Sequence, residues 1–234
     1  MFLKNRTTKE LLSFSALSLA IYTANIELSN AAPQGGDVTS GSATIDSSVA
    51  NTTTITTTSA DSITINWDSF SVGGEELVHF EQPATSSIAV NNIGGGNVSD
   101  IQGSITSNGQ VFLSNPNGFL FGGNSSVNTG SFLATTSSMA LLNNELTLSA
   151  PVNDSSIILD SGSKITTNTG QSASTELSEK FIAIFSSNIS NSGSLTSQDS
   201  HIILSTKNQG TIKLSALDIG IDISDITASN LETN

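Results

Sequence analysis

The sequence predicts an all-β protein that folds as a right-handed parallel β-helix, a solenoid with small antiparallel excursions and an N-terminal cap. Three observations lead to this fold class. Short runs of alternating apolar and polar residues follow one another from about residue 42 onward, and such alternation is typical of strands. The residues between the runs are mostly Gly, Asn and Ser, which favour turns. Similar segments recur at shifts that fit one coil length, as expected of a solenoid.

The predicted strands are three to six residues long and are separated by turn signals such as Asn108-Gly109, Asn117-Gly118 and Ser161-Gly162. The stretch 177–184 has the spacing of one helical turn, but 181–185 alternates better as a strand. No other helix is expected after residue 31. The clearest runs are Ser42–Ile45, Thr53–Thr56, Ser62–Ile65, Ser87–Val90, Gln110–Leu113, Glu145–Leu148, Ser156–Leu159, Lys180–Phe185 and Thr211–Leu214.

Two pairs of segments suggest the size of one coil. Asp154-Ser-Ser-Ile-Ile-Leu159 recurs 45 residues later as Asp199-Ser-His-Ile-Ile-Leu204, and Gly103-Ser-Ile-Thr106 recurs 90 residues later as Gly193-Ser-Leu-Thr196. These shifts equal two and four coils of about 22 residues, a size that suits three short strands and three corners. We therefore expect Ile157 and Ile202 to stack two coils apart. A sandwich or a barrel predicts hairpin turns but not this period.

Residues 1–31 have the three parts of a secretory signal peptide. Lys4, Arg6 and Lys9 precede an apolar run from residue 11 to 26, and Ser29-Asn30-Ala31 provides the small-x-small pattern of a cleavage site. We predict cleavage after Ala31, with Ala32 as the second choice. A buried N-terminal helix is the alternative. A retained transmembrane anchor is disfavoured, because an apolar run of ~16 residues is short for the ~20 that a bilayer requires.

The charge of the predicted mature chain excludes one class of partner. Removing residues 1–31 leaves four lysines, no arginine and 18 acidic residues, a net charge of −14. Such a surface repels phosphate backbones, so no nucleic acid partner is expected. The chain has no cysteine. It therefore contains no disulfide that would oppose crossing a second membrane unfolded.

Three ordered segments carry a family resemblance. They are Trp67-Asp-Ser-Phe70-Ser-Val72-Gly73, Asn115-Pro-Asn-Gly118-Phe-Leu-Phe-Gly122 and Val127-Asn-Thr-Gly130. Together with Pro33–Ile45, they resemble the N-terminal haemagglutination-activity domain of the filamentous-haemagglutinin family, which is a two-partner-secretion domain. The resemblance covers residues 33–140. The sequence lacks the earlier Asn-Pro-Asn-Leu segment of one branch, and members of that family usually continue for hundreds of residues.

The resemblance implies a domain organisation and a partner. Residues 32–145 would form the two-partner-secretion domain, and residues 146–234 would add further β-helix coils. The last coil has no evident cap after Ile223, which is typical of a fragment or a truncated gene. The partner would be an outer-membrane β-barrel transporter whose POTRA domains bind the chain by β-augmentation. The protein would be exported through the periplasm to the cell surface or the medium, where a host or neighbouring-cell surface is a further partner.

The resemblance also indicates which residues form the recognition motif: Asn115, Pro116, Asn117 and Gly118, with Trp67 and Phe70. Pro116 fixes its own φ and favours an extended Asn115, while Asn117 and Gly118 tolerate positive φ. Residues 115–118 therefore predict a tight corner between two strands. Two interpretations remain open, in which the corner only shapes a coil or is also read by the export machinery. Residues 67–83 are expected to leave the β-helix as short antiparallel pairs on its side.

Catalysis and cofactor binding are not expected. His79 and His201 are the only histidines and lie in different predicted strands without cysteines, so they do not suggest a zinc site. Asp218, Asp222 and Asp225 lack the glycine-rich repeat of calcium-binding solenoids, and Glu75-Glu76 fits a solvated loop. A β-helical polysaccharide-cleaving enzyme is a weaker alternative, because the mature chain has no arginine to place beside paired carboxylates. A free-standing adhesin that uses Ser and Thr ladders as its contact surface is the other alternative.

Overall fold

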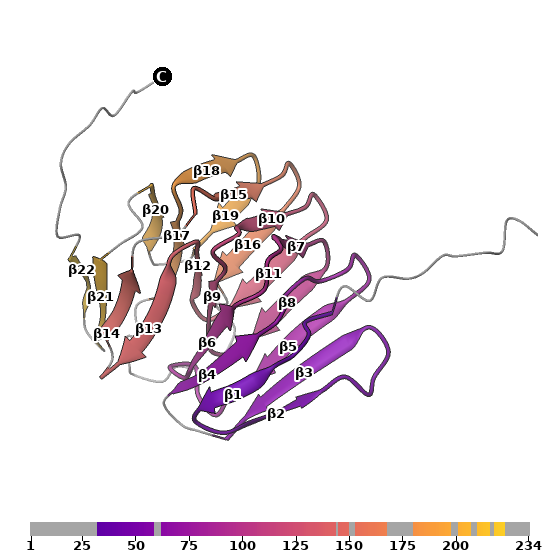
Figure 1. The fold of residues 1–234 in the computed structure, drawn as a ribbon. Coiled ribbons are helices and arrows are strands. Elements are labelled where there is room, and N and C mark those ends of the chain that lie inside the picture. The colour runs from indigo at the N-terminus through magenta and orange to yellow at the C-terminus, as the bar shows by residue number, and fades with distance from the viewer. Residues whose placement is uncertain are drawn as a thin grey trace, which may run out of the picture. The chain divides into compact units, whose positions relative to one another are not determined.

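In the computed structural model, 22 strands are assigned and no helix occurs among the described residues (Figure 1). The description covers residues 32–58, 62–143, 145–149, 153–167, 180–197, 201–206, 210–215 and 218–222. These ranges belong to the unit Ala31–Asn234. The predicted signal peptide lies outside the described residues.

Three sheets form the walls of a parallel β-helix. Sheet I contains, in spatial order, β1 (Asp37–Ser40), β4 (Ser62–Trp67), β6 (Ile88–Ile93), β9 (Gln110–Ser114), β12 (Phe132–Thr135), β17 (Phe181–Phe185) and β20 (His201–Ser205). Sheet II contains β2 (Ala43–Asp46), β3 (Thr52–Thr57), β5 (Leu77–Glu81), β8 (Ser104–Ser107), β11 (Ser126–Thr129), β16 (Lys164–Thr167) and β19 (Ser194–Thr196). Sheet III contains β7 (Ser99–Ile101), β10 (Phe119–Phe121), β15 (Ser156–Leu159) and β18 (Asn188–Asn191).

Equivalent side chains stack in columns from coil to coil, because each strand pairs in register with the strand one coil on. In sheet II, Val78 pairs with Ile105, Ile105 with Val127, and Val127 with Ile165. All four side chains are buried. No single coil has enough apolar surface to enclose itself, so stacking provides the common core. The parallel β-helix predicted from the alternating runs is confirmed, as is the strand at 181–185.

The N-terminal end of the β-helix is closed by an antiparallel cap. β1 pairs antiparallel with β4, and β2 pairs antiparallel with β3. Val38 and Ile45 of these strands pack onto the core. The cap that the sequence predicted near Pro33 is therefore present.

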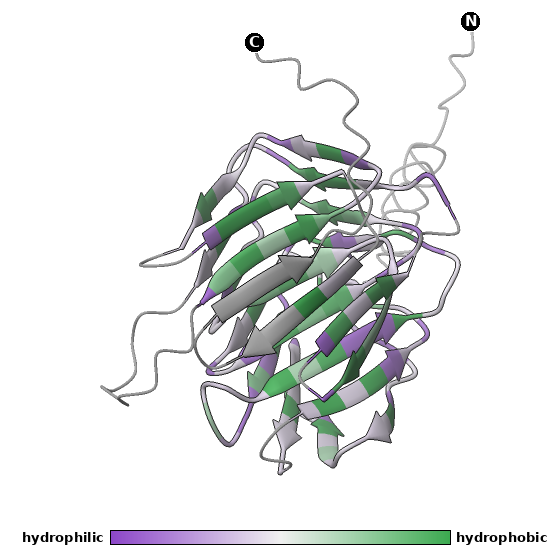
Figure 2. Ribbon diagram, turned by 90° about the vertical axis from the view of Figure 1, so that its left-hand side faces the viewer, coloured by the Kyte–Doolittle hydropathy of each residue, from purple (hydrophilic) through white to green (hydrophobic). Residues whose placement is uncertain are grey.

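The central strands of sheet I, from β6 to β17, are apolar on both faces. Val111 and Leu113 of β9 face the interior, whereas Phe112 between them faces outward. A fourth, antiparallel sheet covers the outward face. Met139 and Leu146, which lie on two of its strands, belong to the same apolar cluster as Phe112. Figure 2 looks onto this side of the molecule, where strands carry long hydrophobic stretches. Sheet IV consists of β13 (Ser138–Leu142), β14 (Glu145–Ser149), β21 (Gly210–Ser215) and β22 (Asp218–Asp222).

The prediction that residues 67–83 form the excursion is wrong. Trp67 ends β4, and Phe70 and Val72 are buried in the interior of the β-helix. β5 pairs in parallel with both β3 and β8. These residues remain in the coil because their apolar side chains fill the core of the first turns. The excursion is sheet IV, which the outward-facing apolar residues of sheet I require.

The predicted stacking of Ile157 on Ile202 is also wrong. Ile157 lies in sheet III and is fully buried, whereas Ile202 lies in sheet I, pairs with Ile182 and is 45% exposed. The other repeat does fall in one column, but Ser104 and Ser194 are three coils apart rather than four. A fixed period fails because insertions such as the β13–β14 hairpin make the coils unequal.

Candidate functional site: the asparagine corner and the indole beside it

Residues 115–118 form the predicted corner between β9 and β10. The Asn115 side chain is fully buried. Its Nδ2 donates to the Asn97 carbonyl at 3.0 Å and to the Ser99 hydroxyl at 2.9 Å, and its Oδ1 accepts the Asn117 backbone N–H at 2.9 Å. Every polar atom of this side chain is therefore used within the fold. Such side-chain bonds supply the partners that a tight corner denies to the backbone.

Asn117 and Gly118 complete the corner in different ways. The Asn117 Nδ2 donates to the Gly95 carbonyl of the preceding coil at 2.5 Å and to the Asn115 Oδ1 at 3.2 Å. Gly118 has a φ of +99°, and a Cβ at this position would lie 2.3 Å from the Ser156 carbonyl oxygen of the following coil. Only glycine combines this backbone conformation with so close an approach. The corner is thus tied to the coil on each side.

Pro116 takes part through its backbone. Its carbonyl oxygen accepts a hydrogen bond from the Ser155 hydroxyl at 2.5 Å. The Asn115 N–H reaches the Thr135 carbonyl at 3.0 Å. The corner therefore has bonds on both sides of the proline, which itself offers no N–H.

The motif that begins at Trp67 stacks on the same column of corners. The Gly94 N–H donates to the Trp67 carbonyl at 2.9 Å. A Cβ on Gly95 would fall 1.9 Å from the Asp68 carbonyl oxygen. The chain after Trp67, the glycine run and the asparagine corner thus occupy equivalent places in three successive coils, and the glycines allow the backbones to approach.

Trp67 and Phe70 lie in the core, 2% and 1% exposed. Their rings meet edge to face with centroids 5.5 Å apart, a favourable aromatic geometry. The Trp67 indole N–H donates to the Asn91 Oδ1 at 2.9 Å, and the Asn91 Nδ2 donates to the Ala89 and Phe112 carbonyls. Asn91 is fully buried. The sequence did not single out Asn91, although an Asn-Asn pair within an apolar run is a visible signal.

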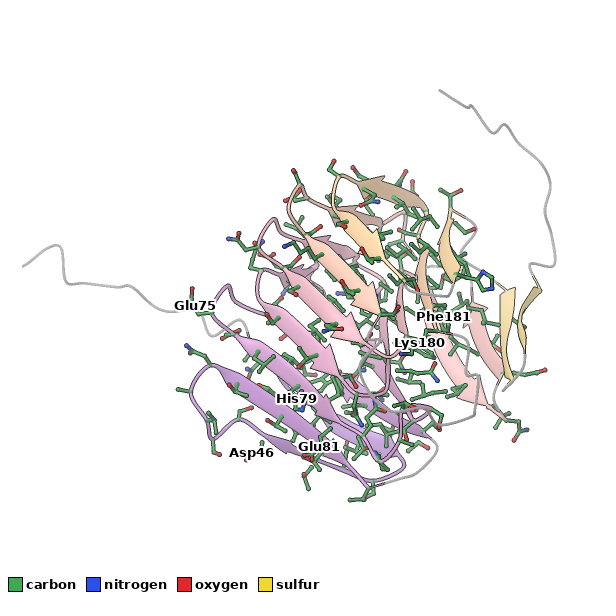
Figure 3. All side chains as sticks on the ribbon, turned by 180° about the vertical axis from the view of Figure 1, so that it is seen from behind. Asp46, Glu75, His79, Glu81, Lys180 and Phe181 are labelled. Atoms are coloured by element: carbon green, nitrogen blue, oxygen red, sulfur yellow. The ribbon has the colours of Figure 1, made fainter. Side chains whose placement is uncertain are left out.

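The other polar residues considered from the sequence do not converge. The Nδ1 of His79 contacts the Thr106 hydroxyl at 2.8 Å, and Glu81 accepts from Thr56 at 3.3 Å; Figure 3 shows His79 and Glu81 side by side on β5. His201 lies in another sheet. Among the residues that the structure describes, no group of three His, Cys, Asp or Glu side chains could hold a metal ion.

Two acidic predictions have different outcomes. Glu76 is bound rather than free in its loop, because its Oε2 accepts the Gly73 N–H at 2.6 Å. Asp218 and Asp222 are the end residues of β22, and Asp225 lies outside the described residues. The structure therefore does not test the calcium site that the sequence disfavoured at these aspartates.

The β-helix, its antiparallel cap and the asparagine corner are the features that define the class of domain. The chain belongs to the TPS secretion domain family, the secretion domains of two-partner-secretion exoproteins, because the family model matches residues 29–233. Proteins of this family are exported across the outer membrane by an outer-membrane transporter partner. The resemblance noted from the ordered motifs is therefore confirmed.

Known proteins agree with this assignment. The chain is 40% identical over 104 residues to the heme/hemopexin-binding protein of Haemophilus influenzae strain Rd, and 41% identical over the same length to a second protein of that name from Haemophilus influenzae. Each alignment covers 44% of this chain but 11% of the relative. The crystal structure of the HMW1 secretion domain from Haemophilus influenzae superposes with a TM-score of 0.67 at 26% identity, covering 84% of this chain and 50% of that one.

The described residues contain no helix, and therefore none that is long and apolar enough to cross a membrane.

Proposed function

We propose that Asn115–Gly118, together with Trp67 and Phe70, is the segment that the POTRA domains of the outer-membrane β-barrel partner bind before the chain folds. The chain crosses the periplasm in an extended form, adds a strand to a POTRA sheet edge and is threaded outward. It then folds into the β-helix at the cell surface or in the medium. The domain performs this task without catalysis and without a cofactor.

The burial of the motif carries the proposal. Asn115, Trp67 and Phe70 are between 0% and 2% exposed in the folded domain, and the amide of Asn115 has all its bonds inside the fold. A partner that reads these side chains meets them only in the unfolded chain. Recognition and folding therefore exclude one another, so the transporter binds only a chain that is still fit for export.

The topology supports the order of events. Every pairing between coils joins residues distant in sequence, for example Ser62 with Ile88 and Phe132 with Ile182. Such non-local contacts form slowly, which leaves time for the transporter to bind. The antiparallel cap closes the N-terminal end. Once the cap and first coils have folded outside, each further coil has a template, and the folded part opposes return through the pore.

The experiment pairs two measurements on the same variants. Asn117→Ala removes two hydrogen bonds in the corner and should lower the free energy of unfolding by about 1–2 kcal/mol. Ile165→Val removes one buried methylene at a distance from the corner and should lower it by about 1 kcal/mol. The urea refolding midpoint is measured on the purified variants. The secreted fraction is measured in cells that carry the partner barrel. We expect Asn117→Ala to reduce secretion far more than Ile165→Val. Secretion that tracks the midpoint in both variants would reject direct recognition and leave the corner as architecture.

A second role at a host or neighbouring-cell surface is supported by sheet II. Its outward face carries a polar column without acidic residues, lysine or arginine across successive coils: Thr54, His79, Thr106, Asn128, Thr166 and Thr196. Hydroxyls and amides in such a column suit hydrogen bonding to a surface glycan. Thr106→Glu should weaken binding of the labelled protein to cells, whereas unchanged binding would contradict this role. Haem or hemopexin binding is not extended to this chain, because the alignment covers 11% of those relatives.

A further inference from the structure

A cleft of about 590 Å³ lies where strands β4, β6 and β9 end and β13 begins. It combines an apolar floor with a polar rim. The floor is formed by Trp67, Ile93 and Met139, which are each at most 5% exposed. The rim includes Asp37, Asp68 and Asn92.

One wall of the cleft is a strand with an unpaired edge. β13 is the first strand of sheet IV, and among the described strands it pairs only with β14. Leu142 and Glu145 are paired residues separated by two positions, so their backbone N–H and C=O groups bond to each other. Along an antiparallel ladder, such bonded pairs alternate with pairs whose N–H and C=O groups point away from the partner strand. Met139 and Leu141 therefore direct their N–H and C=O groups away from β14, toward the free edge. An edge of this kind is a template for another strand.

The rim of the cleft is acidic. Asp37 and Asp68 line it and are exposed, and neither has an ion-pair partner within the described part of the chain. The Oδ1 of Asn92, which also lines the cleft, is a buried atom for which the described residues provide no hydrogen-bond donor. The cleft thus offers two exposed carboxylates, which accept hydrogen bonds from a cation, above a buried amide oxygen that adds to the negative potential.

We propose that the folded domain binds an extended segment of another protein here, which adds as a strand to β13 and places a Lys or Arg side chain in the cleft. The stem of that side chain would pack on Met139 and Ile93, and its charged end would reach Asp37 and Asp68. The segment would form backbone bonds with Met139 and Leu141, the mode known as β-augmentation.

Charge selects this occupant over a second copy of the chain. The whole chain has a net charge of −13, so two copies repel each other, whereas a basic segment is attracted. The inference concerns the folded domain. It therefore stands apart from the proposed recognition of the unfolded chain, and the loss of one leaves the other intact.

The test uses the folded full chain and three labelled synthetic decapeptides of alternating Thr and Val. One carries a central Lys, one a central Glu, and the third carries the Lys with its edge-facing amides N-methylated. Fluorescence anisotropy should show the Lys peptide binding about tenfold more tightly than the Glu peptide, and no binding of the methylated one. Hydrogen exchange of residues 138–142 should slow when the Lys peptide is bound.

Variants assign the site. The double variant Asp37→Asn, Asp68→Asn should lose the preference for Lys over Glu, whereas Asp160→Asn, an exposed aspartate after β15, should retain it. Equal binding of the Lys and Glu peptides, binding of the methylated peptide, or no binding at millimolar concentration would overturn the proposal. Concentration-dependent dimerisation that protects residues 138–142 without peptide would also overturn it, because the occupant would then be a second copy.

Discussion

Asn115→Ala gives the sharpest test of how the corner is built. The change removes two hydrogen bonds donated by Nδ2, at 3.0 and 2.9 Å. It also removes the two that Oδ1 accepts from Asn117, one from the backbone N–H at 2.9 Å and a longer one from Nδ2 at 3.2 Å. A buried bond contributes about 1 kcal/mol, and unsatisfied partners raise the loss. We therefore expect the free energy of unfolding to fall by about 3 kcal/mol.

The same reasoning ranks the other corner substitutions. Asn117→Ala removes two bonds from a half-buried side chain and keeps the backbone bond to Asn115, so it should lower the free energy of unfolding by about 1–2 kcal/mol. Gly118→Val places a β-branched residue at a φ of +99° and its Cβ 2.3 Å from the Ser156 carbonyl oxygen. Backbone strain and the clash together should lower it by about 4 kcal/mol.

The assay is urea unfolding of the purified chain followed by circular dichroism. With an m-value of about 3 kcal/mol per molar urea for a chain of this size, Asn115→Ala should lower the midpoint by about 1 M. Gly118→Val should lower it further and Asn117→Ala less. A midpoint for Asn115→Ala at or above that of Asn117→Ala would refute the bonding scheme of the corner.

Three further predictions concern other parts of the chain. Trp67→Phe leaves the fully buried Asn91 Oδ1 without its indole donor, so it should lower the free energy of unfolding by about 1–3 kcal/mol in the same assay, and an unchanged midpoint would contradict that bond. The backbone N–H of Ser48 holds the pKa of the Asp46 carboxyl below its ordinary value. Because the folded pKa is depressed, this stabilisation is present above the unfolded pKa and lost as pH falls through the folded one; an NMR titration with no lowered pKa at Asp46 would contradict it. N-terminal sequencing of the exported protein should begin at residue 32, after Ala31, whereas a start before residue 25 would overturn the predicted boundary.

Local patterns were sufficient to predict the fold class. Period-2 alternation in runs such as Thr53–Thr56 and Ser62–Ile65 identified strands that the structure contains in β3 and β4. The ordered motifs predicted the corner at residues 115–118, because Pro, Asn and Gly each restrict the backbone in a known way. These features depend on neighbours in sequence, so they can be read from it.

The errors concern what each strand faces. Phe112 and Leu133 point outward and are covered by sheet IV, but alternation does not distinguish a strand with one buried face from one buried on both. The excursion was consequently expected at residues 67–83 rather than at β13 and β14. Similarly, Ile157 and Ile202 occur in alike strands of different sheets, because the same composition suits every wall of the β-helix.

Local sequence patterns could not predict the hydrogen bonds between coils. The link between Trp67 and Asn91 and that between Asn117 and Gly95 join residues more than 20 positions apart. Their pairing depends on the length of each coil, which insertions change. The free edge of β13 depends in the same way on how sheet IV lies over sheet I.

The measurement that tests the central claim most directly is the affinity of the isolated POTRA domains for the unfolded and the folded chain. The chain freshly diluted from urea should bind, and binding should disappear at the rate at which the β-helix forms, because folding buries Asn115, Trp67 and Phe70. Asn117→Ala should weaken binding of the unfolded chain, although Ile165→Val should not. Equal affinity for the folded and the unfolded chain would contradict the account, because the motif would then not be what the POTRA domains read.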